Sequence, residues 1–215
     1  MIRVEVWGDY ASFNRPELKV ERFSYDVMTP SAARNILQAI YWHPTFDWII
    51  DRIYILNPIK KMSIKRNEMK DKLNYTEMHD AAFEQRLPPY LTIRQTQRSA
   101  VVLKDVRYII EAHFVPKQSL DEGTEKFDEN KIYAIMCERL KKGQCFNTPF
   151  LGCREFSANF RLVDNSETIT PFDINLDLGV MLYDNDYCGE SINPYFFKGI
   201  VKHGILDLTS VEVLK

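Results

Sequence analysis

Two helical segments among many strand-like ones constrain most strongly what this chain folds into. Thr29 and Pro30 are typical of a helix start, and apolar residues follow at core-facing spacings up to Trp42. A second amphipathic segment spans residues 129–142 and is followed by Gly143. These two helices are expected to belong to an α+β core.

The strand-like segments fall in a definite order around the helices. Residues 2–8 and 47–56 alternate as strands do, and residues 96–115 are long and β-branched, enough for one or two strands broken near Lys104 and Asp105. The order strand, helix, strand, strand, further strand, helix predicts a ferredoxin-like α+β fold.

Short strand-like runs follow Gly143 and continue to the end of the chain. They predict a small antiparallel β-sheet domain packed on the core. The expected division is therefore a ferredoxin-like domain with a basic hairpin at 1–145 and a C-terminal β-sheet domain at 146–215.

Composition and motifs exclude several classes of protein. No apolar run approaches the roughly 18 residues of a membrane span, and the N-terminus lacks the pattern of a signal peptide, so we expect a soluble, cytoplasmic protein without membrane contacts. The P-loop, Rossmann and GxSxG motifs are missing, which excludes those enzyme classes. The four cysteines form no CxxC pair, and Asp173 and Asp177 lack a glycine-rich loop between them. We therefore predict no metal site, no cofactor and no disulfide framework.

Charge is unevenly distributed along the chain. The formal net charge is −2, but residues 52–72 hold seven basic and two acidic residues, whereas residues 164–190 hold seven acidic and no basic ones. The run 59–69 is expected to pair with the preceding strand as a hairpin with a basic solvent face. Such a face suits a nucleic acid, and a merely solvated surface is the alternative. Its cations are Lys60, Lys61, Lys65 and Arg66.

The end of the second helix has the residue types of a phosphate site. Lys141 and Lys142 precede Gly143, and cations beside a glycine can bring positive charge and backbone N–H groups against a phosphate. Arg154 follows in a strand-like stretch and suits either a phosphate or an internal ion pair, of which we prefer the ion pair.

Other residues suit either chemistry or structure. Tyr41 and Trp42 are core residues in the simpler interpretation, but an aromatic ring there can also orient a ribose or stack on a base. Lys131 begins the second helix, where a cation is mildly unfavourable, so it is either functional or simply solvated. His113 and His43 are more typical of buried or capping histidines than of catalytic ones.

Four runs of sequence carry a specific resemblance. In this order they resemble the subtype I-C (Dvulg) branch of the CRISPR-associated Cas-five proteins, over most of residues 30–184. The resemblance implies a RAMP-type, RRM-related ferredoxin-like domain followed by a C-terminal β-sheet domain. The runs are AIYWHPTFDWIIDRIYILNPIKKMSIKRNE, QRSAVVLKDVRYIIEAHF, the segment from Lys131 through LKKGQCFNTPFLGCREF, and INLDLGVMLYD.

The resemblance also implies an activity. Members of this branch are metal-independent endoribonucleases that cut the hairpin repeats of precursor crRNA. A ribose 2′-hydroxyl attacks the adjacent phosphate and leaves a 2′,3′-cyclic phosphate. The protein then stays on the 5′ handle of the crRNA as a subunit of the type I-C Cascade complex, beside its backbone and large subunits. The alternative is a subunit that binds the handle without cleaving RNA.

Carried onto this sequence, the family's catalytic tyrosine falls on Tyr41 and its lysine on Lys131. A tyrosine with a pKa of about 10 is a poor base, so Tyr41 is expected to position the nucleophile, and Lys131 to stabilise the charge of the transition state. Family members carry a histidine directly after the lysine, whereas this chain has Ile132. Either His113 or His43 then transfers the proton, or the helix is aligned one residue off, or cleavage is slow or absent.

The resemblance also assigns the RNA contacts. Lys141, Lys142 and Gly143 match the family's glycine-containing basic loop, which is expected to grip RNA phosphates. The hairpin cations between Lys60 and Arg66 would hold the repeat stem by its backbone, because A-form RNA is recognised mainly through shape and phosphates.

Overall fold

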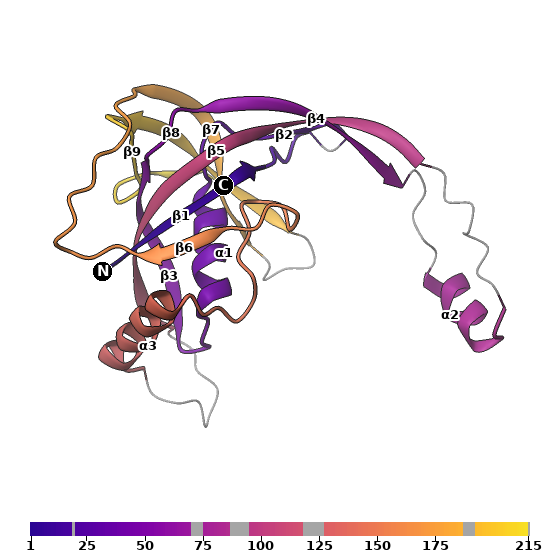
Figure 1. Ribbon diagram of the computed structural model, residues 1–215, viewed down its shortest axis with the longest axis horizontal. Helices are drawn as coiled ribbons and strands as arrows, with labels where there is room; N and C mark the ends of the chain where they lie inside the picture. The colour runs from indigo at the N-terminus through magenta and orange to yellow at the C-terminus, as the bar shows by residue number, and fades with distance from the viewer. Residues whose placement is uncertain (19, 70–74, 87–94, 118–126, 187–191, 215) are drawn as a thin grey trace.

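The computed structural model describes residues 1–18, 20–69, 75–86, 95–117, 127–186 and 192–214, which form a curved sheet of ten strands and three helices (Figure 1). No helix in these ranges is long and apolar enough to cross a membrane. The helices are α1 (Pro30–Ile40), α2 (Tyr75–Phe83) and α3 (Glu129–Lys142). The strands are β1 (Ile2–Ala11), β2 (Arg22–Phe23), β3 (Phe46–Ile55), β4 (Lys60–Met69), β5 (Gln95–Pro116), β6 (Asn159–Leu162), β7 (Leu176–Asp186), β8 (Asn193–Lys202), β9 (Ile205–Asp207) and β10 (Val213–Leu214).

Strands from both ends of the chain share this sheet. Its order is β10-β8-β9-β3-β5-β1-β6, with β7 paired to β8 and with β2 and β4 paired to β5. The late strands join early ones at two places, because β6 pairs with β1 and β9 pairs with β3. The fold combines this predominantly antiparallel sheet with two principal helices, as the α+β prediction requires. The division of the chain at residues 145 and 146 stays a prediction.

Strand β5 organises the sheet. It is one continuous strand of 22 residues, so the two-strand alternative is wrong. Asp105 lies within it at a φ of +60°, at the place where the partner of β5 changes from β4 to β3. The predicted hairpin of residues 59–69 with the preceding strand is also wrong, because β4 pairs with β5 from Lys60 opposite Lys104 onward. Asn57 stabilises this crossing, since its side-chain amide donates to the carbonyl of Asp105 at 2.8 Å.

Helices α1 and α3 pack on one face of the sheet. Thr29 caps α1, as predicted, by accepting a hydrogen bond from the N–H of Ala32 at 3.3 Å. Asp128 caps α3 by accepting from the N–H of Lys131 at 3.1 Å. Their apolar sides join the strands in one core. The buried residues of that core include Val4, Val6, Ile36, Leu37, Ile40, Ile110, Ala112, Ile132, Met136 and Leu140.

The LGCREF segment fastens the loop after α3 to the end of β1. Leu151 is fully buried, and its carbonyl accepts from the N–H of Ser12 at 3.0 Å. Gly152 has a φ of +83°, and a Cβ at this position would lie 2.1 Å from the carbonyl oxygen of Ser12. Glycine is therefore needed here for two reasons: the backbone is left-handed, and two chain segments approach too closely to leave room for a Cβ.

We expect Gly152→Ala to lower the free energy of unfolding by about 3 kcal/mol, because it adds a clash to backbone strain. Gly179→Ala is the matched control, since Gly179 has a φ of +66° but open space around its missing Cβ. The control variant is expected to pay only for the backbone strain, so its free energy of unfolding should fall by about 1 kcal/mol. Urea denaturation of both variants measures the difference, and equal losses would rule out a contribution from the Ser12 contact.

Candidate nucleic-acid interface

The end of α3 is a glycine cap that carries two lysines. Gly143 adopts a φ of +64°, and its N–H donates to the last turn of the helix. The N–H of Gln144 donates to the carbonyl of Arg139 at 2.9 Å. Both backbone donors are thus occupied by helix carbonyls, whereas the side chains of Lys141 and Lys142 are exposed, and their contact with RNA phosphates stays a prediction. The Lys142 ammonium already contacts Glu138 at 2.5 Å.

Tyr41 lies at the junction of α1 and α3. It caps α1 with extended backbone, and its carbonyl accepts from the indole N–H of Trp48 at 3.1 Å. The ring is only 7% exposed and packs against Phe46, with the guanidinium of Arg139 at 4.8 Å from its centroid. Arg139 also donates to the carbonyl of Ile40 at 2.7 Å. The structure therefore brings Tyr41 together with α3, through a cation that the sequence did not single out.

Lys131 is exposed in the first turn of α3, as its predicted role requires. It lies eight residues before Arg139, or about 12 Å along a helix. The following residue, Ile132, is 5% exposed and belongs to the core. The side chain at this position of α3 therefore contributes to packing.

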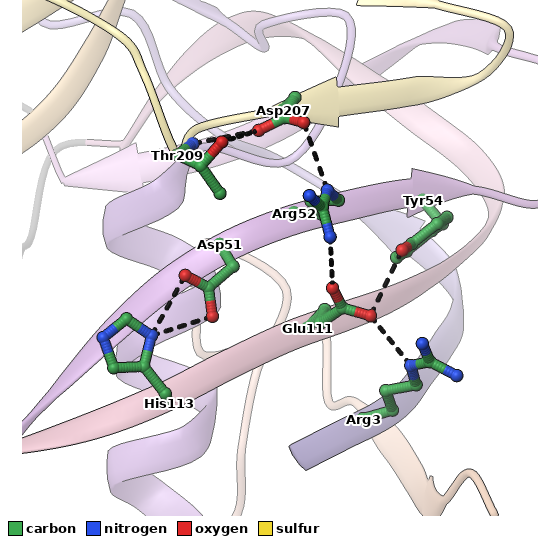
Figure 2. Close-up of polar contacts among 8 residues, drawn as sticks. All are labelled: Arg3, Asp51, Arg52, Tyr54, Glu111, His113, Asp207 and Thr209. Atoms are coloured by element: carbon green, nitrogen blue, oxygen red, sulfur yellow. Dashed lines mark hydrogen bonds and ion pairs between the residues drawn. The ribbon is translucent and has the colours of Figure 1, made fainter. Parts of the chain in front are cut away.

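His113 lies on the other face of the sheet from Tyr41. Its Nδ1 is 2.9 Å from the Asp51 carboxylate, and it shares a face of β5 with Glu111, as Figure 2 shows. The next residue, Phe114, points to the core and packs against Phe46, the neighbour of Tyr41. The sheet thus separates the His113 imidazole from the Tyr41 ring, and the catalytic role of His113 stays a prediction.

His43 is closer to Tyr41 along the chain, because it follows α1 by three residues. Its Nδ1 lies 2.9 Å from the hydroxyl oxygen of Thr45, and its side chain is partly exposed. Of the two histidines proposed for proton transfer, His43 is therefore the nearer to Tyr41 along the chain, and its catalytic role stays a prediction.

Glu111 is the centre of a buried ion-pair network on that other face (Figure 2). It accepts from Arg3 and Arg52 at 2.8 Å each and from the Tyr54 hydroxyl at 3.2 Å. Burial raises the pKa of the Glu111 carboxyl, but the hydrogen bonds from Arg3 and Arg52 outweigh burial and hold the pKa below its ordinary value. Arg52 also donates to Asp207 at 3.1 Å. All these contacts join side chains of the protein to one another, so we interpret the network as structural.

The cations of β4 do not form one basic face. Alternation along the strand places Lys61 and Lys65 on one side and Lys60 and Arg66 on the other. Three of them contact acidic side chains, at 3.3 Å for Lys60 with Asp105, 2.6 Å for Lys61 with Asp26, and 2.5 Å for Arg66 with Glu155. Lys65 has no such contact among the described residues. RNA binding by these four stays a prediction, and Lys65 is the best placed of them.

A pocket beside Tyr41 was not predicted. Asn35 and Gln38 of α1 line one wall together with Trp42, which follows the helix, and the loop after α3 forms the other with Phe146 and Arg154, around a cavity of about 670 Å³. The helical spacing of the α1 residues puts them on one face, but the facing wall lies more than 100 residues away in the sequence. The indole of Trp42 is 54% exposed and the ring of Phe146 is 75% exposed.

Metal-ligating side chains do not gather in the described part of the chain. There, no group of three or more histidine, cysteine, aspartate or glutamate side chains is arranged to hold a metal ion. Cys188 lies outside the described residues.

Solved structures share this fold. A functionally uncharacterized protein from Streptococcus mutans superposes with a TM-score of 0.70 at 23% identity, covering 97% of this chain and 92% of that one. A crystal structure of a CRISPR-associated protein gives a TM-score of 0.72 at 26% identity, covering 97% and 91%. A chain of a CRISPR RNA-guided surveillance complex is more distant, with a TM-score of 0.50 at 11% identity, covering 99% and 88%.

Sequence comparison agrees with the structural one. The chain is 44% identical over 217 residues to a CRISPR pre-crRNA endoribonuclease Cas5d of Mannheimia succiniciproducens, covering 96% of this chain and 94% of the relative. It is 40% identical over 183 residues to a protein of the same name from Thermus thermophilus, covering 85% and 72%. A family model described as CRISPR-associated protein (Cas_Cas5) matches residues 1–201. The chain therefore belongs to the Cas5d family of CRISPR-associated proteins, as its sequence motifs predicted.

Proposed function

We propose that this chain is an endoribonuclease that cleaves CRISPR repeat hairpins in precursor crRNA without a metal and remains on the 5′ handle. One observation carries the proposal: the chain is 44% identical, over nearly its full length, to a relative named for cleavage of pre-crRNA. On this proposal the protein works in the cytoplasm, as a subunit of the type I-C Cascade complex with its backbone and large subunits.

We infer that the core is ferredoxin-like. The central strand order β3-β5-β1-β6 supports this inference, together with α1 after β1 and α3 before β6. Along the chain, β1, α1, β3, β5, α3 and β6 form a strand-helix-strand-strand-helix-strand unit. Across the sheet, the second strand of this unit is followed by the third, the first and the fourth, which is the ferredoxin-like order. Both helices then lie at one side, where Tyr41 and α3 meet.

The reaction begins when the 2′-oxygen of a ribose attacks the adjacent phosphorus. The bond from phosphorus to the 5′-oxygen of the next nucleotide breaks, leaving a 2′,3′-cyclic phosphate and a 5′-hydroxyl. Tyr41 positions the 2′-hydroxyl, and Lys131 offsets the extra negative charge on the phosphorane. A base takes the 2′-proton and an acid delivers one to the 5′-oxygen, and His43 or His113 are the histidines proposed for this transfer.

RNA binding rests on the cations at the end of α3 and on β4. Lys141 and Lys142 are exposed at the α3 end, with Gly143 holding the turn that presents them. Lys65 presents a further ammonium from β4. Contacts of this kind are made to phosphates and position an RNA without reading its sequence.

Ile132 favours a second candidate function, that of a handle-binding subunit that does not cleave. Its side chain fills the core where family members carry a histidine, so a proton-transfer group is missing from the start of α3. The cations that bind RNA are unaffected by this replacement.

One assay separates the two functions. The purified protein is incubated in EDTA with an all-ribose repeat hairpin and with the same hairpin carrying a 2′-deoxy residue at the cleavage site. We expect equal binding of both and cleavage of the first alone, because removing the nucleophile stops the reaction without removing a phosphate contact. Tight binding with both RNAs intact would establish the non-cleaving subunit. Cleavage of the deoxy RNA would contradict the 2′-hydroxyl mechanism.

A further inference from the structure

We propose that the pocket between α1 and the loop after α3 binds one unpaired nucleotide of the repeat RNA, with its base between Trp42 and Phe146 and its phosphate at Arg154. This inference rests on the proposed function and adds a site that reads an extruded base. It concerns recognition of single-stranded RNA beside the stem, in addition to the phosphate contacts of the lysines.

The pocket is built before any ligand arrives. The N–H groups of Phe146 and Asn147 both donate to the carbonyl of Ala39 at 3.0 Å, which holds the loop against the end of α1. Arg139 donates to the neighbouring carbonyl of Ile40. Two walls that are distant in sequence are thereby fixed at a set separation, and binding requires little ordering of the protein.

The lining has the chemistry that recognises a nucleobase. Trp42 and Phe146 expose most of their rings, and aromatic faces are the usual stacking surfaces for unpaired bases. The amides of Asn35, Gln38 and Asn147 also line the cavity and supply donors and acceptors for the edge of a base. The cavity volume of about 670 Å³ lies in the range of small-ligand pockets, about 300–1,000 Å³.

Arg154 supplies the charge that favours RNA over a neutral ligand. An internal ion pair of Arg154 was expected, and the neighbouring Glu155 does not supply it, because the Glu155 carboxylate contacts Arg66 at 2.5 Å. Among the described residues no acidic side chain contacts the Arg154 guanidinium, which lies exposed at the pocket. A guanidinium without a counter-ion beside two open aromatic rings matches a nucleotide, with an anionic phosphate next to a flat base.

The place of the pocket connects it to the proposed catalytic residues. Trp42 directly follows Tyr41, and the two rings point to opposite environments, one exposed in the pocket and the other covered by Arg139. A base in a duplex is stacked and paired, so only an unpaired nucleotide can enter. A nucleotide held by Trp42 would anchor the strand beside the ribose that Tyr41 positions.

The test is a binding cycle between pocket variants and abasic RNAs. The affinity of the full chain is measured for the repeat hairpin and for versions with one abasic residue at each unpaired position. We expect Trp42→Ala and Phe146→Ala each to weaken binding of the intact RNA about 10- to 100-fold, since stacking on one base is lost. In the wild-type protein, one of the abasic RNAs should bind similarly weakly, because it lacks the base that enters the pocket. Trp42→Ala should bind this abasic RNA and the intact RNA with equal affinity, because the stacking contact is already lost.

Further variants make the result interpretable. Trp42→Phe keeps an aromatic face and should retain binding within about threefold, while Phe83→Ala removes an exposed ring from α2 and should change nothing. Arg154→Gln should reduce the salt dependence of binding by about one phosphate contact. Pocket variants that bind like wild type, or abasic penalties that simply add to those of Trp42→Ala, would overturn the pocket while leaving the proposed function intact. A wild-type chain that shows no salt-dependent RNA binding would overturn both.

Discussion

Replacing Lys131 by alanine is expected to slow single-turnover cleavage of the repeat hairpin about 10²- to 10³-fold, the loss seen when one group that stabilises transition-state charge is removed. Affinity for the uncleaved RNA should fall little, because the ammonium is needed most when the phosphorane forms. Rates measured with protein in excess, together with binding to the 2′-deoxy hairpin, separate the two effects. Tyr41→Phe should lower the same rate, because it removes the hydroxyl while the buried ring keeps its contacts with Phe46 and Arg139.

Lys198 is the matched control for Lys131. It is an exposed lysine on β8, and its ammonium is 3.7 Å from Asp177. Lys198→Ala removes the same charge from the protein and should leave the cleavage rate unchanged. A loss of rate in both variants would mean that overall charge accounts for the effect, and a Lys131→Ala variant that cleaves at the wild-type rate would remove this lysine from the mechanism.

Local sequence rules predicted α1 and α3 well because their signals are local, whereas the short helix α2 was not predicted. Thr29 with Pro30 gives the start of α1, and Gly143 gives the end of α3, where the structure has a left-handed cap. The partner of β4 was predicted wrongly for the opposite reason. A hairpin with β3 is the nearest choice along the chain, but β5 is long enough to pair with β4 through one half and with β3 through the other.

The sequence predicted single residues of the site, but it did not predict which side chains are buried or which segments meet. Tyr41 and Trp42 are adjacent aromatic residues, and the helical period does not say which ring is buried, because α1 ends at Ile40 and Tyr41 is already extended. The structure buries the tyrosine and exposes the tryptophan. The pocket wall from Phe146 to Arg154 could not be predicted, since it depends on backbone hydrogen bonds to Ala39 across the fold.

Replacing Glu111 by alanine is expected to lower the free energy of unfolding by about 3 kcal/mol, at the lower end of the cost of breaking a buried ion pair. The variant leaves Arg3 and Arg52 without their shared carboxylate and the Tyr54 hydroxyl without its acceptor. Both arginine side chains are partly exposed, which limits the loss, and Arg52 keeps Asp207. Glu138→Ala is the control, because it removes an exposed carboxylate that is ion-paired with Lys142 on the surface of α3, and it should leave the free energy of unfolding nearly unchanged.

The pH dependence of this loss distinguishes the carboxylate from simple packing. The pKa of Glu111 is lower in the folded protein than its ordinary value of 4.5, so folding favours the ionised form. Its stabilising contribution is therefore fully present above the unfolded pKa and is lost as pH falls through the folded pKa. Glu111→Gln keeps the shape without the charge, so its deficit relative to wild type should be constant near neutral pH and should shrink below about pH 4.5. Urea denaturation across this range measures both proteins. A deficit that stays unchanged down to the acid transition would mean that Glu111 contributes through its shape and hydrogen bonds and not through its charge.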